Sequence, residues 1–179
     1  MAKTILDPVE QEPEKPPRHI TGLVFELARH LGTAIDRRVA PFNVTGQQAA
    51  LLIRSGKEPG VTLSHLAPWL GTDNAGVTRL VDRLEVKGLV TRRPSVSDRR
   101  AVIVAPTAAG EDLIPQLIAA LDEVTEHLTR DLTSDDLTRV ESSLLHLLHN
   151  LGDDECGPDH GHRYRIKIRG TPQPGESAP

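Results

Sequence analysis

The chain has 179 residues, aromatic residues make up only 2% of it, and its formal net charge is −4. This length suits one domain with tails, whose core must consist mainly of Leu, Val, Ile and Ala. No apolar run approaches the roughly 18 residues of a membrane-spanning helix, the N-terminus has no apolar signal core, and the single Cys excludes a disulfide framework or a Cys-rich zinc site. A soluble, cytoplasmic protein is therefore expected.

The first predicted elements are a tail and a long helix. Residues 1–18 are rich in Pro, Glu and Lys, a composition that predicts a disordered tail. A folded domain is expected over residues 19–151. It begins with an amphipathic helix, because apolar residues recur at helical spacing from Ile20 to Ile35 and the pattern ends near Pro41.

Two short helices are predicted next. Thr45 is followed three residues later by Gln48, which is the spacing of a capping box, and Gly56 is expected to end this helix. Thr62 is the expected cap of the following helix, and Gly71 is expected to end it.

Residues 72–88, TDNAGVTRLVDRLEVKG, predict an amphipathic helix that ends at Gly88. Its apolar residues share one narrow arc: Val77, Leu80, Val81 and Leu84. Its polar and small residues fill the opposite arc: Asn74, Ala75, Thr78, Arg79, Asp82 and Arg83. A short helix, a tight turn and a second helix with a polar outer face form the helix-turn-helix pattern, whose second helix enters the major groove of DNA.

A β-hairpin and two helices are predicted to follow. The runs LVTRR and AVIVA are of β type, and PSVSDR joins them as a polar tip. One helix runs from near Thr107 to about Leu132, a second follows TSDD and extends to Leu151, and the Gly/Pro-rich residues 152–179 are expected to be a tail. The two helices carry apolar seams: Leu117, Leu121, Val124 and Leu128 in the first, and Leu137, Val140, Leu144, Leu147 and Leu151 in the second.

This order of elements predicts a mainly α-helical, α+β fold, in which a small β-hairpin forms a wing beside a helix-turn-helix. The DNA-binding part is expected over about residues 44–106. The helices over about 19–40 and 107–151 are expected to form a dimerisation region, because one subunit does not easily cover such long apolar seams. A stable two-fold dimer is the predicted assembly.

The charge distribution agrees with a DNA-binding part. Val77 to Ala105 contains seven Lys or Arg against three Asp or Glu, a net charge of +4, so the rest of the chain carries −8. A local basic patch on an acidic body attracts a polyanion to one face. A solvated helix face with internal ion pairs is the alternative, and charge alone does not exclude it.

Residues 77–110, VTRLVDRLEVKGLVTRRPSVSDRRAVIVAPTAAG, closely resemble the signature stretch of the MarR family of bacterial transcriptional regulators. In element order the resemblance covers roughly residues 20–150, and it is specific over 62–110. It implies a homodimer whose first and last helices intertwine, with one winged helix per subunit on double-stranded DNA. The implied function is a ligand-responsive repressor that binds a pseudo-palindromic operator.

The resemblance also implies site residues. Asn74, Thr78 and Arg79 match positions where the family's recognition helix meets bases and phosphates, Arg100 matches the wing arginine of the minor groove, and Asp98 matches the acidic residue that holds it. An arginine can donate two hydrogen bonds to guanine, and a narrow A·T-rich minor groove attracts a guanidinium. The predicted DNA-binding set is Thr72, Asn74, Ala75, Thr78, Arg79, Arg83, Asp98, Arg99 and Arg100.

Several alternatives stay open. In one of them, Arg79 pairs with Asp82 or Asp73 instead of DNA. For Arg83, Arg92 and Arg93, phosphate contact and plain solvation are equally open. A winged-helix module for protein interaction is the alternative function. The basic segment 163–169, RYRIKIR, fits a strand, a DNA-following arm or a disordered tail.

No catalytic motif, cofactor or metal site is expected. The histidines His146, His149, His160 and His162 and the nearby Cys156 straddle a Gly/Pro-rich segment, which does not favour the convergent ligands of a zinc site. A small-molecule effector is implied by the resemblance only, and its identity does not follow. Pro68 departs from the family pattern, which has an ordinary helix former at this position. A proline inside a helix removes one backbone hydrogen-bond donor, so Pro68 should bend or shorten the helix.

Overall fold

The computed structural model describes residues 19–95 and 101–155. The predicted terminal tails, the wing-tip residues Asp98, Arg99 and Arg100, and the basic segment 163–169 lie outside these ranges. The described elements are α1 (Ile20–Val39), the short 3-10 helix η1 (Ala40–Phe42), α2 (Gly46–Lys57), α3 (Leu63–Trp69), α4 (Asn74–Val86), β1 (Val90–Pro94), β2 (Val102–Pro106), α5 (Ala108–Thr129) and α6 (Ser134–Glu155). The predicted fold class, mainly helical with one antiparallel hairpin, is confirmed.

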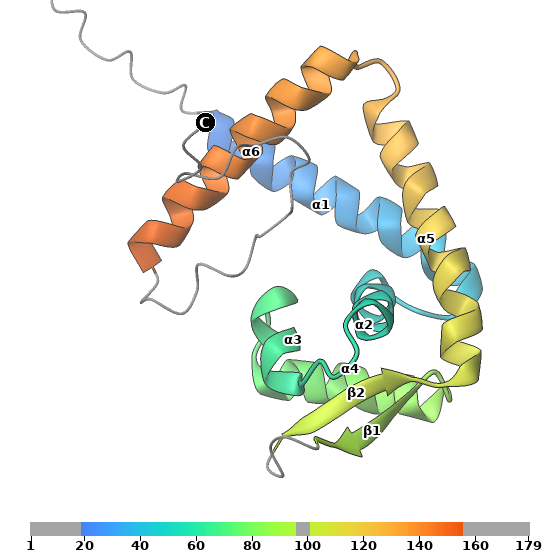
Figure 1. The fold of residues 1–179 in the computed structure, drawn as a ribbon. Helices are drawn as coiled ribbons and strands as arrows, with labels where there is room; N and C mark the ends of the chain where they lie inside the picture. Colours follow the sequence, from blue (N-terminus) through green and yellow to red (C-terminus); the bar gives the residue numbers. More distant parts are fainter. Residues whose placement is uncertain (1–18, 96–100, 156–179) are drawn as a thin grey trace, which may run out of the picture.

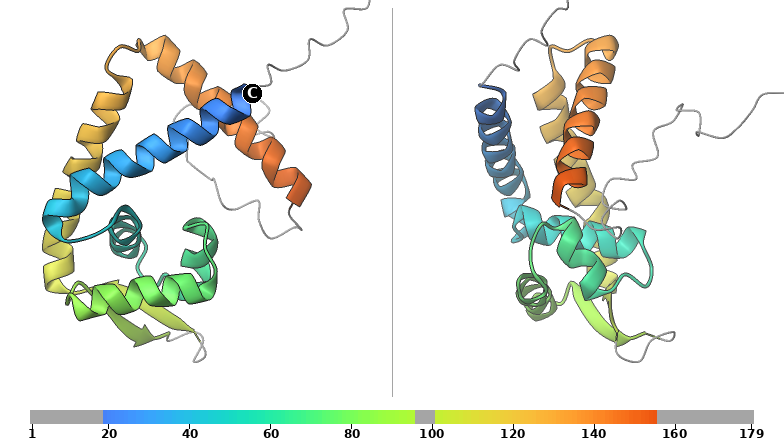
Figure 2. Two further views of the ribbon diagram at one scale, coloured as in Figure 1. Left: turned by 180° about the vertical axis from the view of Figure 1, so that it is seen from behind. Right: turned by 90° about the vertical axis from the view of Figure 1, so that its left-hand side faces the viewer.

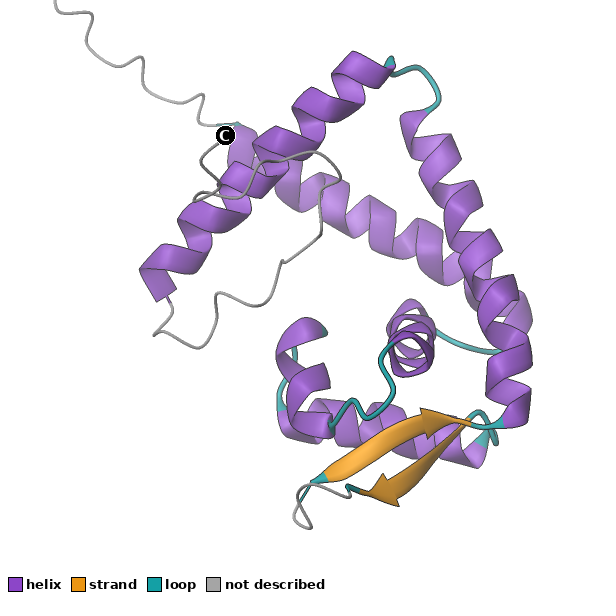
Figure 3. Cartoon of the chain, viewed as in Figure 1, coloured by secondary structure: helices purple, strands orange, loops and turns teal. Residues whose placement is uncertain are grey.

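The molecule has two parts (Figure 1). The winged helix consists of α2, α3, α4 and the β1–β2 hairpin, and the long helices α1, α5 and α6 form an arm beyond it (Figures 2 and 3). Helix α5 joins the two parts, because it starts at the end of the hairpin and packs along both α1 and α2. None of the described helices is long and apolar enough to cross a membrane.

Helix α2 begins as predicted. The Thr45 side chain accepts a hydrogen bond from the Gln48 amide, and the Gln48 side chain accepts one from the Thr45 amide, so the capping box is confirmed. The expected stop at Gly56 is wrong, because α2 continues to Lys57. A Cβ on residue 56 would overlap the side chain of Ile114 in α5. Glycine is therefore present for close helix packing and not as a helix stop.

Helix α3 is short, as Pro68 near its end predicts. Gly71 follows in the left-handed region at a φ of 64°, and the Thr72 amide donates to the carbonyl of Ala67 at 3.0 Å, which closes a Schellman-type turn. Thr62 holds the N-cap position, but its side chain makes no capping bond and instead shares a hydrogen bond with Ser64 at 2.9 Å.

The hairpin pairs β1 with β2 in antiparallel register, with Val90 opposite Pro106 and Arg92 opposite Val104. The free edge of β2 is covered as well, because the Val104 amide donates to the carbonyl of Val61 at 3.0 Å. A two-stranded hairpin is marginal alone, so this third segment and the packing against α4 stabilise the wing.

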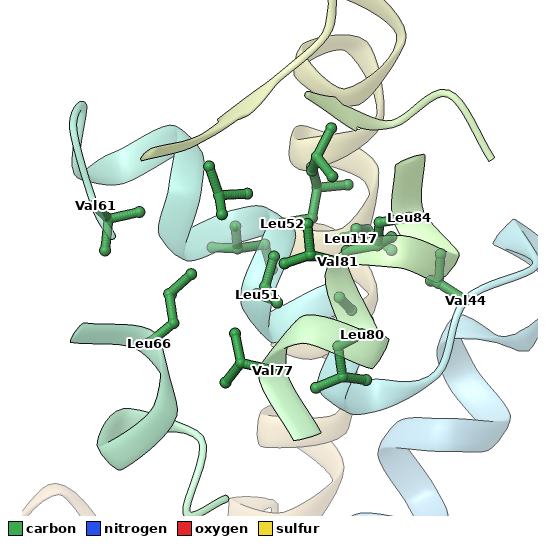
Figure 4. Packing of buried hydrophobic residues seen from close by; sticks show 14 of the residues in the cluster. Val44, Leu51, Leu52, Val61, Leu66, Val77, Leu80, Val81, Leu84 and Leu117 are labelled. Atoms are coloured by element: carbon green, nitrogen blue, oxygen red, sulfur yellow. The ribbon is translucent and has the colours of Figure 1, made fainter. Parts of the chain in front are cut away.

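The core lies inside the winged helix, where α2, α4 and the start of α5 meet (Figure 4). The predicted inner arc of α4 is confirmed, because Val77, Leu80, Val81 and Leu84 are all buried. They pack with Leu51, Leu52, Leu66 and Leu117 from the neighbouring helices. Burial of such side chains stabilises the fold by about 1.5–3 kcal/mol each. The core therefore fixes the opposite arc of α4 toward solvent.

Helix α6 departs from its predicted end, because it extends to Glu155 and thus four residues into the predicted tail. Its start follows the Thr133 cap, whose hydroxyl accepts a hydrogen bond from the Asp136 amide. Its apolar seam is exposed, and so are several large apolar side chains of α1. The arm therefore presents unpaired apolar surface.

Candidate nucleic-acid interface

The first turn of α4 projects small and polar residues outward. The Asp73 side chain caps the helix by accepting a hydrogen bond from the Gly76 amide at 2.6 Å. A Cβ on residue 76 would overlap the hydroxyl of half-buried Thr72, so glycine lets the turn and the helix meet closely. Asn74 and Ala75 are left exposed at the helix N-terminus, where backbone N–H groups favour an anion.

The next turns of α4 expose Thr78, Arg79 and Arg83 on the face opposite the core. The Thr78 hydroxyl donates to the Asn74 carbonyl at 2.8 Å, which leaves its oxygen as an acceptor for an external donor. Within the described part of the chain, Arg79 and Arg83 make no ion pair and no side-chain hydrogen bond. Their guanidinium groups are therefore free to donate to an external acceptor.

The alternative in which Arg79 pairs with a neighbouring carboxylate does not describe this structure. Asp73 accepts the capping bond of the helix, and Asp82 pairs with Arg92 at 2.6 Å. Both candidate partners of Arg79 are thus engaged elsewhere.

Two cations of the predicted basic patch are used inside the protein. The Lys87 ammonium donates to the Asn43 carbonyl and, at 2.9 Å, to the buried side chain of Gln48. Arg92 pairs with Asp82 and Glu85 of α4 and also donates to the Thr78 carbonyl at 3.2 Å. The outward basic surface is therefore smaller than the composition suggests.

The role of Arg92 was missed by sequence reasoning, although a signal existed. Side chains alternate between the two faces of a strand, so Arg92 and Arg93 must point in opposite directions. Arg92 has the same parity as Val90, which is buried, and so it faces α4. Arg93 faces the other side and lines a groove of about 670 Å³ between the hairpin, the end of α2 and the start of α5.

A second groove, of about 770 Å³, lies between the C-terminal half of α1 and α5. Its lining includes Arg37, Arg38 and Arg130 with Glu123 and His127, and Arg38 pairs with Glu123. The α5 part of this lining begins at Glu123, in the C-terminal half of the helix.

The predicted site residues are thus divided by the structure. Thr72, Asn74, Ala75, Thr78, Arg79 and Arg83 come together at the start and along the outer face of α4, beside the hairpin. Asp98, Arg99 and Arg100 belong to the segment between β1 and β2 that lies outside the described residues. Among the described residues, no group of three or more His, Cys, Asp or Glu could hold a metal ion.

This arrangement is suited to an acceptor-rich polyanion. A convex helix offers amide, hydroxyl and guanidinium groups in rows at helical spacing, and the width of an α-helix fits the major groove of B-DNA. Aromatic and large apolar side chains, which enrich the centres of protein–protein interfaces, are absent from the exposed residues of this face between 72 and 83, where Ala75 is the apolar member.

Comparison with known proteins agrees with this geometry. Residues 44–102 match the model of the MarR family. The chain is similar to apo wild-type MarR from E. coli, with 28% identity over 75% of this chain and 99% of that one, and a TM-score of 0.62.

Two further solved structures share the fold at lower identity. A protein from Listeria monocytogenes, described as a MarR-family transcriptional regulator and solved with a 26-mer DNA, is 21% identical over 75% of this chain and 90% of that one, with a TM-score of 0.70. CouR from Rhodococcus jostii RHA1, solved with p-coumaroyl-CoA, is 23% identical over 71% and 90%, with a TM-score of 0.66.

Proposed function

Because this chain carries a winged helix of the MarR family, we propose that it is a transcriptional regulator that binds a specific DNA sequence as a homodimer. The observation that carries the proposal is the outer face of α4. This face joins Asn74, Thr78, Arg79 and Arg83 beside a hairpin, and its two arginines have no partner among the described residues. Arginines that the fold does not engage are available to an external anion, so their place on the outer face of α4 supports DNA contact.

Within this proposal α4 lies in the major groove. Arg79 donates to the acceptors of a guanine, and Asn74 reads an adenine. The Ala75 side chain is small enough to let α4 approach the base edges closely, and its methyl group can touch the methyl group of a thymine. Thr78 accepts from an exocyclic amino group, because its own proton is already donated to the Asn74 carbonyl.

Phosphate contacts set the orientation of the helix. Thr72 stands at the N-terminus of α4, and Arg83 lies one turn beyond Arg79 on the same side. Both are suited to the backbones that flank the groove. The resemblance to MarR adds Asp98, Arg99 and Arg100, with Arg100 in the minor groove and Asp98 orienting it.

The arm supports a dimer. The seam of α6 is exposed, with 40% of Leu144 and 70% of Leu151 accessible, and in α1 Phe25 is 78% exposed. Large contiguous apolar patches mark interfaces. A two-fold axis through the arm would give two α4 helices that face one side of the DNA, and thus a pseudo-palindromic operator.

A small-molecule effector that releases the protein from DNA is part of the proposal. CouR, which shares the fold, was solved with an acyl-CoA thioester. In this chain the groove between α1 and α5 is lined by three arginines and two glutamates, and Arg38 pairs with Glu123. The lining thus keeps one more arginine than glutamate, which suits an anionic compound. Repression is the expectation that the resemblance to MarR carries.

Selection of duplexes from a random-sequence library by the purified protein, followed by a gel shift on the DNA beside its own gene, tests the proposal. We expect one pseudo-palindromic sequence to be enriched and to compete much better than a scrambled duplex. Recovery of no common sequence would contradict DNA readout, and would favour a protein-interaction module instead.

A further inference from the structure

Besides apolar packing, a polar cluster around Arg92 joins the wing to α4, and we propose that Arg92 is the positioning residue that fixes the wing relative to the DNA-reading helix. The proposal rests on the proposed function. Three donors of Arg92 point at α4: one guanidinium nitrogen pairs with Glu85, and the other with Asp82 at 2.6 Å and with the Thr78 carbonyl at 3.2 Å. These groups are called the Arg92 cluster below.

The cluster also holds the backbone of the hairpin. The Arg92 amide donates to the second carboxylate oxygen of Glu85 at 3.0 Å. This amide lies on the edge of β1 that faces away from β2, since the Val104 amide opposite it points outward to Val61. Glu85 therefore binds both the strand edge and the side chain of the same residue. A fork that holds two points of the strand fixes its direction as well as its distance from α4.

Arg92 has a second effect through charge. Asp82 and Glu85 lie on the helix that is proposed to approach a polyanion, and the Asp82 side chain is 54% exposed. Two unpaired carboxylates there would repel phosphates. Arg92 supplies an internal counter-charge, and its own side chain is only 28% exposed because it lies between strand and helix.

The neighbouring arginine has a different environment. Arg93 lies on the opposite face of β1, and it makes no ion pair or side-chain hydrogen bond among the described residues. Since its side chain has no partner among the described residues while that of Arg92 is engaged by α4, Arg93 is the one suited to a phosphate. The two adjacent arginines thus separate into an external and an internal role.

The test is a double-mutant cycle of Arg92→Ala and Glu85→Ala with two readouts. The first is amide hydrogen exchange across β1 and β2, and the second is affinity for the duplex that the wild-type protein selects from a random library. We expect each single variant to speed exchange in the hairpin and to weaken binding by roughly threefold to thirtyfold. The double variant should be no worse than the poorer single variant, because both act through one contact.

The sign of the Glu85→Ala effect separates positioning from simple electrostatics. Loss of a negative charge near DNA should strengthen binding if charge alone matters, whereas loss of the Arg92 cluster should weaken it. Glu111→Ala, which removes an exposed carboxylate near the wing that has no partner among the described residues, is the matched control for charge loss alone. It should leave exchange in the hairpin unchanged, and it should leave the affinity unchanged or raise it slightly. Arg92→Lys should restore part of the affinity, since it keeps the charge but not the fork.

Salt dependence gives a further discrimination. The slope of the logarithm of the binding constant against the logarithm of the salt concentration counts the ions released on binding. If Arg92 bound a phosphate, Arg92→Ala would lower this slope by about one ion, whereas a positioning role leaves the slope unchanged. Tighter binding by Glu85→Ala, additive effects in the cycle, or unchanged exchange in the hairpin would each overturn the proposal. If the wild-type protein selects no duplex, the proposed function fails, and the exchange data still decide whether the Arg92 cluster holds the wing.

Discussion

At the scale of residues, the arginines and lysine of one basic segment have separate tasks that depend on their partners. Arg79 and Arg83 have no partner in the part of the chain that the structure describes, whereas Lys87 is bonded to Gln48 and Arg92 to Asp82 and Glu85. Sequence reasoning found the outer arc of α4, because helical periodicity alone assigns it. It could not find the partners, since those contacts join residues that the chain brings together only on folding.

Replacing Arg79 by Ala tests direct readout by a free arginine. We expect a loss of about 1–3 kcal/mol in binding to the selected duplex, and relaxed discrimination at one base pair of each half-site. Fluorescence anisotropy against duplexes that carry every base at each position measures both. Arg139→Ala, which removes the same charge from the exposed surface of α6, is the control and should change neither. An equal loss on every duplex would make Arg79 a phosphate contact.

At the scale of elements, most helices and both strands could be predicted, because their periodicity, caps and glycines are local signals. The capping box of Thr45 and the left-handed Gly88, with a φ of 68°, are examples. The errors arose where tertiary contact decides. Gly56 is the expected stop but lies inside α2 against Ile114. Thr62 does hold the predicted N-cap position, and there its backbone pairs with β2 while its side chain makes no capping bond.

Gly110 tests the joint between the winged helix and α5. Ala is favoured over Gly in a helix by about 1 kcal/mol. Here, however, a Cβ would overlap the carbonyl oxygen of Leu89. This oxygen is held in place because it accepts a hydrogen bond from the Thr107 amide at 3.0 Å. Gly110→Ala should therefore lower the free energy of unfolding by about 1–3 kcal/mol. Gly32→Ala in α1, where a Cβ meets nothing within 4 Å, should raise it instead. Urea titrations measure both, and a stabilised Gly110→Ala would disprove the close contact.

The start of α6 should depend on pH. Hydrogen bonds from the hydroxyl and amide of Thr133 hold the pKa of Asp136 below its ordinary value of 3.8. A lowered folded-state pKa means that the stabilisation is complete above this ordinary value and is lost as pH falls through the folded-state pKa. The protection factors of amides in the first turn of α6, which correct for the intrinsic pH dependence of exchange, should therefore fall as the pH drops below about 3.8. Asp136→Asn should remove this dependence, Asp135→Asn should retain it, and identical profiles for both would contradict the cap.

At the scale of the whole molecule, the arm is incomplete in one chain. The exposed apolar side chains of α6 follow one face at heptad-like spacing: Leu137, Val140, Leu144, Leu147 and Leu151. The sequence predicted this seam and hence a partner. It could not predict the angle between α1 and α6, because packing between chains fixes it.

A charge in the seam should break the dimer. Leu144→Glu would bury a carboxylate in an apolar interface, a change that costs several kcal/mol per subunit, so we expect a monomer at micromolar concentration. Ser142→Glu, two residues away and on the face of α6 opposite the seam, should remain dimeric. Sedimentation velocity measures both, and a wild-type monomer at the same concentration would refute the proposed assembly.

A hydroxyl-radical footprint of the wild-type protein on its selected duplex tests the central claim most directly, since it reports DNA contact and symmetry together. A two-fold dimer with one α4 helix per half-site predicts protected patches on both strands, related by a dyad and centred about 10 base pairs apart or at a near variant of that spacing. One unsymmetrical patch would contradict the dimer, and a uniform cleavage ladder would contradict DNA reading by α4.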